Sequence, residues 1–181
     1  ISIIHHADVK RMLLFQKSVV EGSLALLLYC SKLADIAHVS TGEEQSEAAL
    51  LLDFLTPIAK SYPSEMCCLT TSTAVQILGG AGYTTDFPVE QFYREARIHP
   101  IHEGTTGIHG MDLLGRKITM ANGRAAVLFF NACGKTIHDA KENSTLESKA
   151  TELESSLRTL LQVTNHLLGI AKSGDTEAYL S

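Results

Sequence analysis

The sequence has no run of lysine or arginine, and its 15 basic residues are outnumbered by 20 acidic ones, giving a formal net charge of −5. Nucleic acids and anionic membranes bind basic patches, so neither is an expected partner. No stretch of about twenty uncharged apolar residues occurs, and no basic segment followed by an apolar run opens the chain. These absences predict a soluble, cytoplasmic protein.

Cysteine is also scarce, and the four cysteines, Cys30, Cys67, Cys68 and Cys133, form no C-x-x-C pair. With 45% hydrophobic residues, the 181-residue chain has enough apolar side chains to fill the core of one domain,. A domain with such a core does not need disulfides. We therefore expect reduced cysteines that pack as small apolar residues.

Apolar residues recur at three- and four-residue steps, and no run alternates convincingly with period two. Long helices are predicted over residues 9–41, 48–59, 64–78, 108–118 and 125–140, with a short one over 88–97. A last helix starts at the capping-box pattern Ser144-Thr145-Leu146-Glu147 and ends before Gly174. Pro57 is expected to kink or split its helix. The prediction is an all-α, up-and-down helical bundle with short connections and extra C-terminal helices.

The segment QILGGAGYTTDFP, residues 76–88, is not typical of a bundle helix or a simple connection, because three glycines fall within four positions after a helix. Glycine lets the backbone approach a phosphate or a ring closely. The G-x-G-x-x-G template is not met and a helix precedes the glycines, so a Rossmann site is excluded. The simple alternative is a helix C-cap followed by a turn.

The second unusual segment is IHEGTTG, residues 101–107, which leads into a helix. Glu103 is open to two interpretations. It is either a first-turn acid that stabilises the helix by about 0.3–1 kcal/mol, or a general base beside free N–H groups that also bind a carbonyl oxygen.

The residues leave two other interpretations open. His99, His102 and Glu103 suggest a metal-binding hydrolase, although Pro100 breaks the helix that would align them. The apolar face of the last helix suggests a non-catalytic interaction module, with a core-facing bundle helix as its simpler explanation.

Four motifs in order, QILGGAGY (76–83), DFPVE (86–90), YREAR (93–97) and IHEGT (101–105), resemble the C-terminal helical domain of the acyl-CoA dehydrogenases. The flanking runs resemble the branch with a C-terminal helical extension, which includes 3-methylmercaptopropionyl-CoA dehydrogenase-like proteins. The resemblance implies that residues 1–121 form the C-terminal four-helix-bundle domain and that residues 122–181 begin the extension. The chain would then be the rear portion of a longer flavoenzyme and inactive alone.

The resemblance further implies that Glu103 removes the α-proton of an acyl-CoA while a hydride passes to flavin N5. Thr105 matches a residue that contacts FAD. Gln76, Gly79 and Gly80 match the segment that contacts the FAD of the neighbouring subunit, which implies a homodimer or a dimer of dimers. The expected electron acceptor is an electron-transfer flavoprotein.

The chain departs from the family pattern at three positions. His102 replaces the usual Tyr, Glu95 replaces an Asp, and Gly107 stands where some members carry a Gln that contacts FAD. Gly107 has no side chain to make that FAD contact, and His102 places an imidazole beside the expected base.

Overall fold

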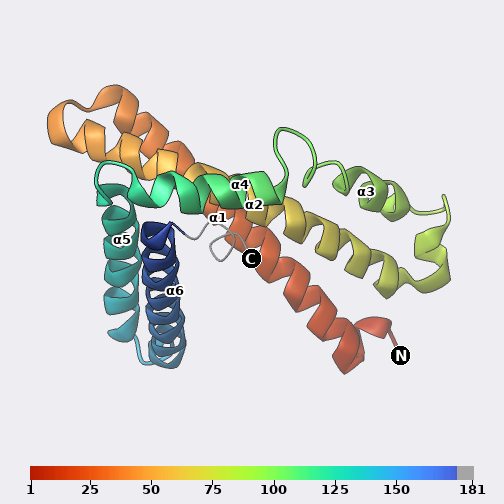
Figure 1. Cartoon of the computed structure of the whole chain (residues 1–181). Coiled ribbons are helices and arrows are strands. Elements are labelled where there is room, and N and C mark those ends of the chain that lie inside the picture. Colours follow the sequence, from red (N-terminus) through yellow and green to blue (C-terminus); the bar gives the residue numbers. More distant parts are fainter. Residues whose placement is uncertain (175–181) are drawn as a thin grey trace. The chain divides into compact units, whose positions relative to one another are not determined.

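The structure is a computed structural model that describes residues 1–174. The chain divides into two compact units, Ile1–Met120 and Ala121–Ser181. The described residues form helices and contain no strand (Figure 1), so the predicted all-α fold is confirmed. The division falls beside the predicted boundary at residues 121–122, while the assignment of the second unit as an extension stays a prediction.

The first unit is built on two long helices, α1 (Ala7–Val39) and α2 (Gly42–Leu78). Ser40 and Thr41 join them in extended conformation, which makes a tight antiparallel hairpin. Apolar side chains at helical spacing form the core between them: Met12, Val19, Leu33, Ala48, Leu51, Phe54 and Leu55. The helices therefore pair because their apolar stripes face each other.

Helix α2 is continuous through Pro57 and Pro63, so the predicted separate helices over 48–59 and 64–78 are wrong. Each proline removes one backbone donor and so costs about 3 kcal/mol in an isolated helix. Here α2 contacts α1, α3 and α4, and Pro57 is itself buried. This packing keeps the helix unbroken, which local propensity alone does not predict.

A long connection follows α2 and contains the 3₁₀ helix η2 (Gly79–Tyr83) and α3 (Val89–Ala96). It leads to α4 (Thr106–Gly115) and the 3₁₀ helix η3 (Lys117–Thr119). The predicted helix over 108–118 is thus too long. Arg116 departs from helical geometry, with φ −120° and ψ −55°, and the side chain of Lys117 is buried in an ion pair with Asp53 of α2. The chain leaves the helix at Arg116, and this turn brings the ammonium of Lys117 to the carboxylate of Asp53.

The connection between α2 and α4 is long, so the prediction of short connections is wrong for this part of the unit.

The second unit is a helical hairpin of α5 (Arg124–Lys141) and α6 (Glu147–Ser173), which lie side by side. Gly174 ends α6 with φ 80°, as expected of a left-handed cap,. The predicted capping box is wrong, since Leu146 occupies the N-cap without a side-chain bond. Asn143 instead accepts hydrogen bonds from the backbone and hydroxyl of Thr145, at 3.0 and 2.7 Å. These bonds hold the turn that precedes α6 and do not cap a backbone N–H of the helix.

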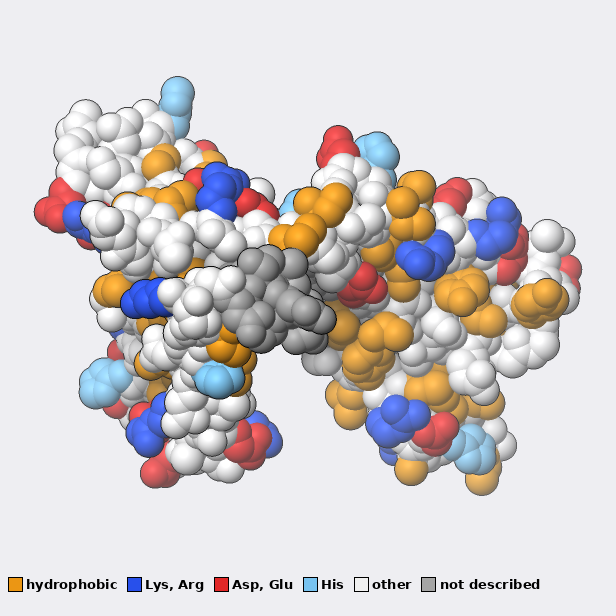
Figure 2. Space-filling model, in the orientation of Figure 1, with side chains coloured by type: hydrophobic (Ala, Val, Ile, Leu, Met, Phe, Trp, Pro, Cys, Tyr) orange, Lys and Arg blue, Asp and Glu red, His pale blue; other side chains and the backbone are white. Residues whose placement is uncertain are grey.

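Large apolar side chains stay exposed on the first unit. On α1 they are Leu13, Leu14, Val20, Leu24, Leu27, Leu28, Tyr29 and Val39, and Figure 2 shows hydrophobic side chains over the visible face of this unit. By length and composition alone α1 could cross a membrane, since an 18-residue window of it has a mean hydropathy of 1.3, although Lys17 and Glu21 form an ion pair on this helix. Exposed apolar surface of this extent is typical of a face that packs against another molecule or against another part of a larger protein.

Candidate active site

Glu103 lies in the loop between α3 and α4, in the left-handed region with φ 53°. Thr105 is the N-cap of α4, and its hydroxyl accepts from the backbone N–H of Ile108 at 3.4 Å. Glu103 therefore precedes the cap, and the first turn of α4 holds no acid. This excludes the first-turn interpretation of Glu103. The Glu103 carboxylate is exposed on this chain, so any burial of it must come from residues outside this sequence or from a bound molecule.

Gly104 follows Glu103 with φ 99°, a conformation that side-chain-bearing residues rarely adopt,. A Cβ placed on Gly104 would lie 2.9 Å from Nε2 of His109, and that nitrogen is 3.3 Å from the carbonyl oxygen of Glu103. The missing side chain lets the ring of His109 pack directly beneath the loop. The positive φ is therefore the main reason for glycine here, and the approach of the movable His109 ring is a second, smaller one.

Helix α2 holds the loop from the other side. Nζ of Lys60 donates to the carbonyl oxygens of His99 and Gly104, at 2.8 and 2.5 Å. The carboxylate of Glu65 accepts from the hydroxyl of Thr106, at 2.5 Å. Lys60 and Glu65 are not predicted as site residues from the sequence. The only signal for them was the presence of charged residues near Pro57 and Pro63 in an otherwise apolar stretch.

A third contact fixes the start of the loop, where Sγ of Cys68 donates to the carbonyl oxygen of Ala96, the last residue of α3, at 3.3 Å. The four cysteines of the chain are free thiols, as predicted, and each is half-buried. Burial raises the pKa of the neighbouring Cys67 thiol, and the adjacent Cys68 raises it further. A thiol with a raised pKa is a poor nucleophile at neutral pH, so Cys67 is not a candidate for covalent catalysis.

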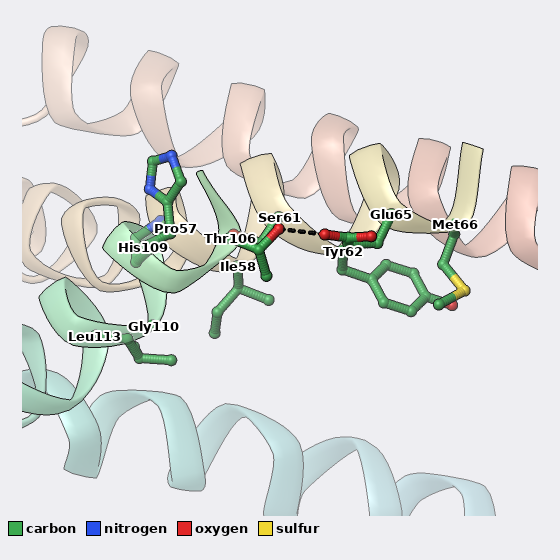
Figure 3. A pocket seen from close by; sticks show the side chains of 10 residues that line it. All are labelled: Pro57, Ile58, Ser61, Tyr62, Glu65, Met66, Thr106, His109, Gly110 and Leu113. Carbon is green, nitrogen blue, oxygen red and sulfur yellow. Dashed lines mark hydrogen bonds between the residues drawn. The ribbon is translucent and has the colours of Figure 1, made fainter. Parts of the chain in front are cut away.

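A pocket of about 360 Å³ lies between α2 and α4, next to this loop. Figure 3 shows the side chains that line it, with Thr106 bonded to Glu65. The lining residues are Pro57, Ile58, Ser61, Tyr62, Glu65, Met66, Thr106, His109, Gly110 and Leu113. The wall is therefore largely apolar, and the bonded pair of Thr106 and Glu65 forms part of it.

The glycine-rich segment forms a second candidate region, at the far end of α2. Gln76 is exposed in the last turn, and Gly79 ends the helix with φ 59°. A Cβ on Gly79 or Gly80 would meet nothing within 4 Å, whereas one on Gly82 would lie 2.8 Å from the carbonyl oxygen of Val75. Gly79 and Gly80 thus present open backbone, while Gly82 serves internal packing.

The expected site residues fall into two groups that the chain does not bring together. Glu103 and Thr105 sit beside Lys60. Gln76 comes 16 residues later on the same helix (76 − 60), which at 1.5 Å per residue is about 24 Å along its axis. The two groups are therefore separated along α2 and do not form one cluster on this chain.

An ion cluster stabilises the end of α4. Asp112 accepts from Nε of Arg116 at 2.6 Å and lies 3.9 Å from Nζ of Lys117. The hydrogen bond from Arg116 is the largest of the influences that hold the pKa of Asp112 below its usual value. The same contact raises the pKa of Arg116. The cluster joins α4 and η3 to α2, since Lys117 also pairs with Asp53.

The metal-binding alternative gains no support from the geometry. Within residues 1–174, no group of three or more His, Cys, Asp or Glu side chains is arranged to hold a metal ion. His99, His102 and Glu103 follow one another in the loop without forming such a group.

Comparison with known proteins gives a consistent result. The family model described as acyl-CoA dehydrogenase, C-terminal domain, matches residues 2–118. A 3-methylmercaptopropionyl-CoA dehydrogenase of Ruegeria pomeroyi is 36% identical over 180 residues, covering 99% of this chain and 31% of the relative. A broad-specificity linear acyl-CoA dehydrogenase of Mycobacterium tuberculosis is 38% identical over 127 residues, 69% of this chain and 21% of the relative. A butyryl-CoA dehydrogenase of Syntrophomonas wolfei is 36% identical over 124 residues, 68% of this chain and 20% of the relative. The chain thus spans a third or less of the length of these relatives.

Proposed function

Because the chain belongs to the acyl-CoA dehydrogenase family, whose C-terminal domain it carries, we propose that it is the rear part of an FAD-dependent enzyme. The enzyme converts an acyl-CoA thioester to the trans-2-enoyl-CoA. The observation that carries the proposal is the placement of Glu103, the exposed acid of the loop, in a left-handed conformation two residues before Thr105, the N-cap of α4.

In the proposed reaction Glu103 removes the α-proton of the thioester. The bound thioester and the missing domains are expected to bury the carboxylate, which strengthens it as a base. Its position before α4 supports this role, because unpaired backbone N–H groups at a helix start stabilise the negative charge that develops on the thioester oxygen. Glu103 needs no side-chain partner within the loop for this task.

FAD, when bound, supplies the chemistry that accepts the β-hydrogen as a hydride at N5. The residues present fit such a group in two places. Thr105 has a hydroxyl whose oxygen accepts from Ile108 and whose hydrogen stays available for donation,. At Gly79 and Gly80 the space that a side chain would occupy is open, so a ligand can approach the backbone there. The exposed amide of Gln76 lies beside them.

The separation of these two places supports assembly as a homodimer or a dimer of dimers. Each subunit would contribute Thr105 and Glu103 to its own cofactor and Gln76, Gly79 and Gly80 to that of its neighbour. We place the assembled enzyme in the cytoplasm, with the exposed apolar face of α1 covered by protein rather than lipid. An electron-transfer flavoprotein would reoxidise the flavin.

The exposed apolar surface also favours a second candidate, a helical interaction module without chemistry,. The two candidates differ in one property that is simple to measure. Full-length protein purified from cells contains tightly bound FAD if it is the enzyme, and contains none if it is only an interaction module.

The proposed reaction is tested with full-length protein mixed anaerobically with a panel of acyl-CoAs while the flavin absorbance band is followed. We expect bleaching in the wild type and in the control Glu44→Gln, which changes an exposed acid at the start of α2. Glu103→Gln should retain FAD and fail to bleach. Equal bleaching by Glu103→Gln would show that the base lies elsewhere, and absence of flavin from all three proteins would refute the enzyme.

A further inference from the structure

Local hydrogen bonds satisfy most backbone N–H groups of the loop that carries Glu103, whereas two of its carbonyls accept from a residue outside the loop. The N–H groups of Ile101 and His102 both donate to the carbonyl oxygen of Ile98, at 3.0 and 2.9 Å. The carbonyls of His99 and Gly104, which bracket the four residues 100–103, instead accept from Lys60 of α2. A single ammonium group therefore closes both ends of the segment that contains Glu103.

Lys60 is well placed to hold this segment firmly. It lies in the middle of a 37-residue helix, and its side chain is half-buried rather than free in solvent. The two carbonyls are 39 and 44 residues away in sequence, so no local turn can substitute for the contact. Hydrogen bonds from a charged donor are stronger than those between neutral groups.

The contacts on either side of the segment do not involve Lys60. Cys68 holds the end of α3 through the carbonyl of Ala96, and Glu65 holds the start of α4 through Thr106. Loss of the ammonium is therefore expected to loosen the residues between these two contacts and to leave α3 and α4 in place. The left-handed backbone of Glu103 depends on the loop being held, because such a conformation is unfavourable for a residue with a side chain.

We propose that Lys60 is a positioning residue for Glu103. Its ammonium holds the carbonyls of His99 and Gly104 and so fixes the backbone from which the carboxylate projects. The inference rests on the proposed role of Glu103 as the base. Lys60 itself touches neither substrate nor cofactor in this role, and no proton passes through it.

The test uses full-length, FAD-containing protein in four forms: wild type, Lys60→Met, Lys60→Arg and Lys32→Met. Met keeps the apolar stem and removes the donors, whereas Arg keeps both charge and donors. Lys32 is an exposed residue of α1 and serves as the matched control. Amide hydrogen exchange of the peptide spanning residues 97–105, kcat and KM for an acyl-CoA, and FAD content are measured for each form.

In Lys60→Met we expect faster exchange confined to residues 97–105, and a fall in kcat of about 10- to 100-fold, because a misplacement of about 1 Å at a reacting group has an effect of this size. KM should change less than about threefold and FAD content should stay constant, since the proposal involves orientation rather than uniform binding. Lys60→Arg should recover part of both effects, and Lys32→Met should match the wild type.

Unchanged exchange in Lys60→Met would overturn the proposed contact, and faster exchange with an unchanged kcat would overturn the positioning role. A rise in KM that accounts for the whole loss of kcat/KM would equally refute it. Whether Glu103 is the base is decided by a different measurement, the flavin bleaching of Glu103→Gln. If Glu103→Gln still bleaches the flavin, Lys60 has no base to position, while the exchange measurement continues to report on the contact with the loop.

Discussion

Gly104→Ala is the substitution that tests most directly whether the loop geometry depends on a missing side chain. Alanine at φ 99° must adopt a backbone conformation that costs about 1–3 kcal/mol,. Its Cβ would approach Nε2 of His109 to 2.9 Å. The ring can move aside, but it then gives up its contact with the carbonyl of Glu103, worth about 0.5–1.5 kcal/mol,.

A smaller term opposes these losses, because alanine restricts the unfolded chain and stabilises the fold by about 0.4–1 kcal/mol. The balance is a loss of about 1–3 kcal/mol in the free energy of unfolding of the first unit. Isothermal urea unfolding of the full-length protein, followed by a probe in this unit, measures the loss. Gly107→Ala is the matched control, since a Cβ placed on Gly107 would have nothing within 4 Å and the φ of this residue is not positive. In the first turn of α4 this control should be neutral or stabilising.

The double variant Gly104→Ala/His109→Ala separates the two causes. Removing the ring relieves the collision and leaves the backbone strain, so the double variant should be less destabilised than the sum of the single ones by about 0.5–1.5 kcal/mol. Strict additivity would refute the ring contact. A Gly104→Ala protein as stable as the wild type would refute the whole argument, including the left-handed conformation at this position.

Two further predictions concern the scaffold around the site. Asp112→Asn should destabilise the protein at neutral pH, because the folded-state pKa of Asp112 is lowered, chiefly by its hydrogen bond from Arg116, and a lowered pKa contributes stability that is lost as pH falls through it,. The difference in urea midpoint between variant and wild type should therefore shrink as the pH is lowered below that pKa, and a difference independent of pH would contradict this. Pro63→Ala restores a backbone donor for the carbonyl of Ala59 within α2 and should raise the free energy of unfolding by about 1–3 kcal/mol,. A decrease in stability would show that the ring of Pro63 contributes packing that outweighs the missing bond.

Much of the fold follows from short-range features of the sequence. Apolar residues at three- and four-residue steps place most helices, and Gly79 and Gly174 end two of them where only glycine adopts the backbone comfortably,. The motif residues Glu103 and Gln76 are identifiable without a structure because their neighbours in sequence are part of the pattern. The sequence by itself thus determines the fold class, the family resemblance and the candidate base.

Tertiary structure determines where helices continue or end when contacts with residues distant in sequence oppose the local helix propensity. Pro57 does not break α2, because contacts with three other helices offset the missing hydrogen bond. The last helix of the first unit ends early at Gly115, because Lys117 turns inward to pair with Asp53. The contact of Lys60 with the loop spans about 40 residues, and no spacing rule links a lysine to carbonyls so far along the chain. Periodicity and caps report on neighbours within one or two turns, so the sequence alone could name the acid and only the folded chain could show what holds it.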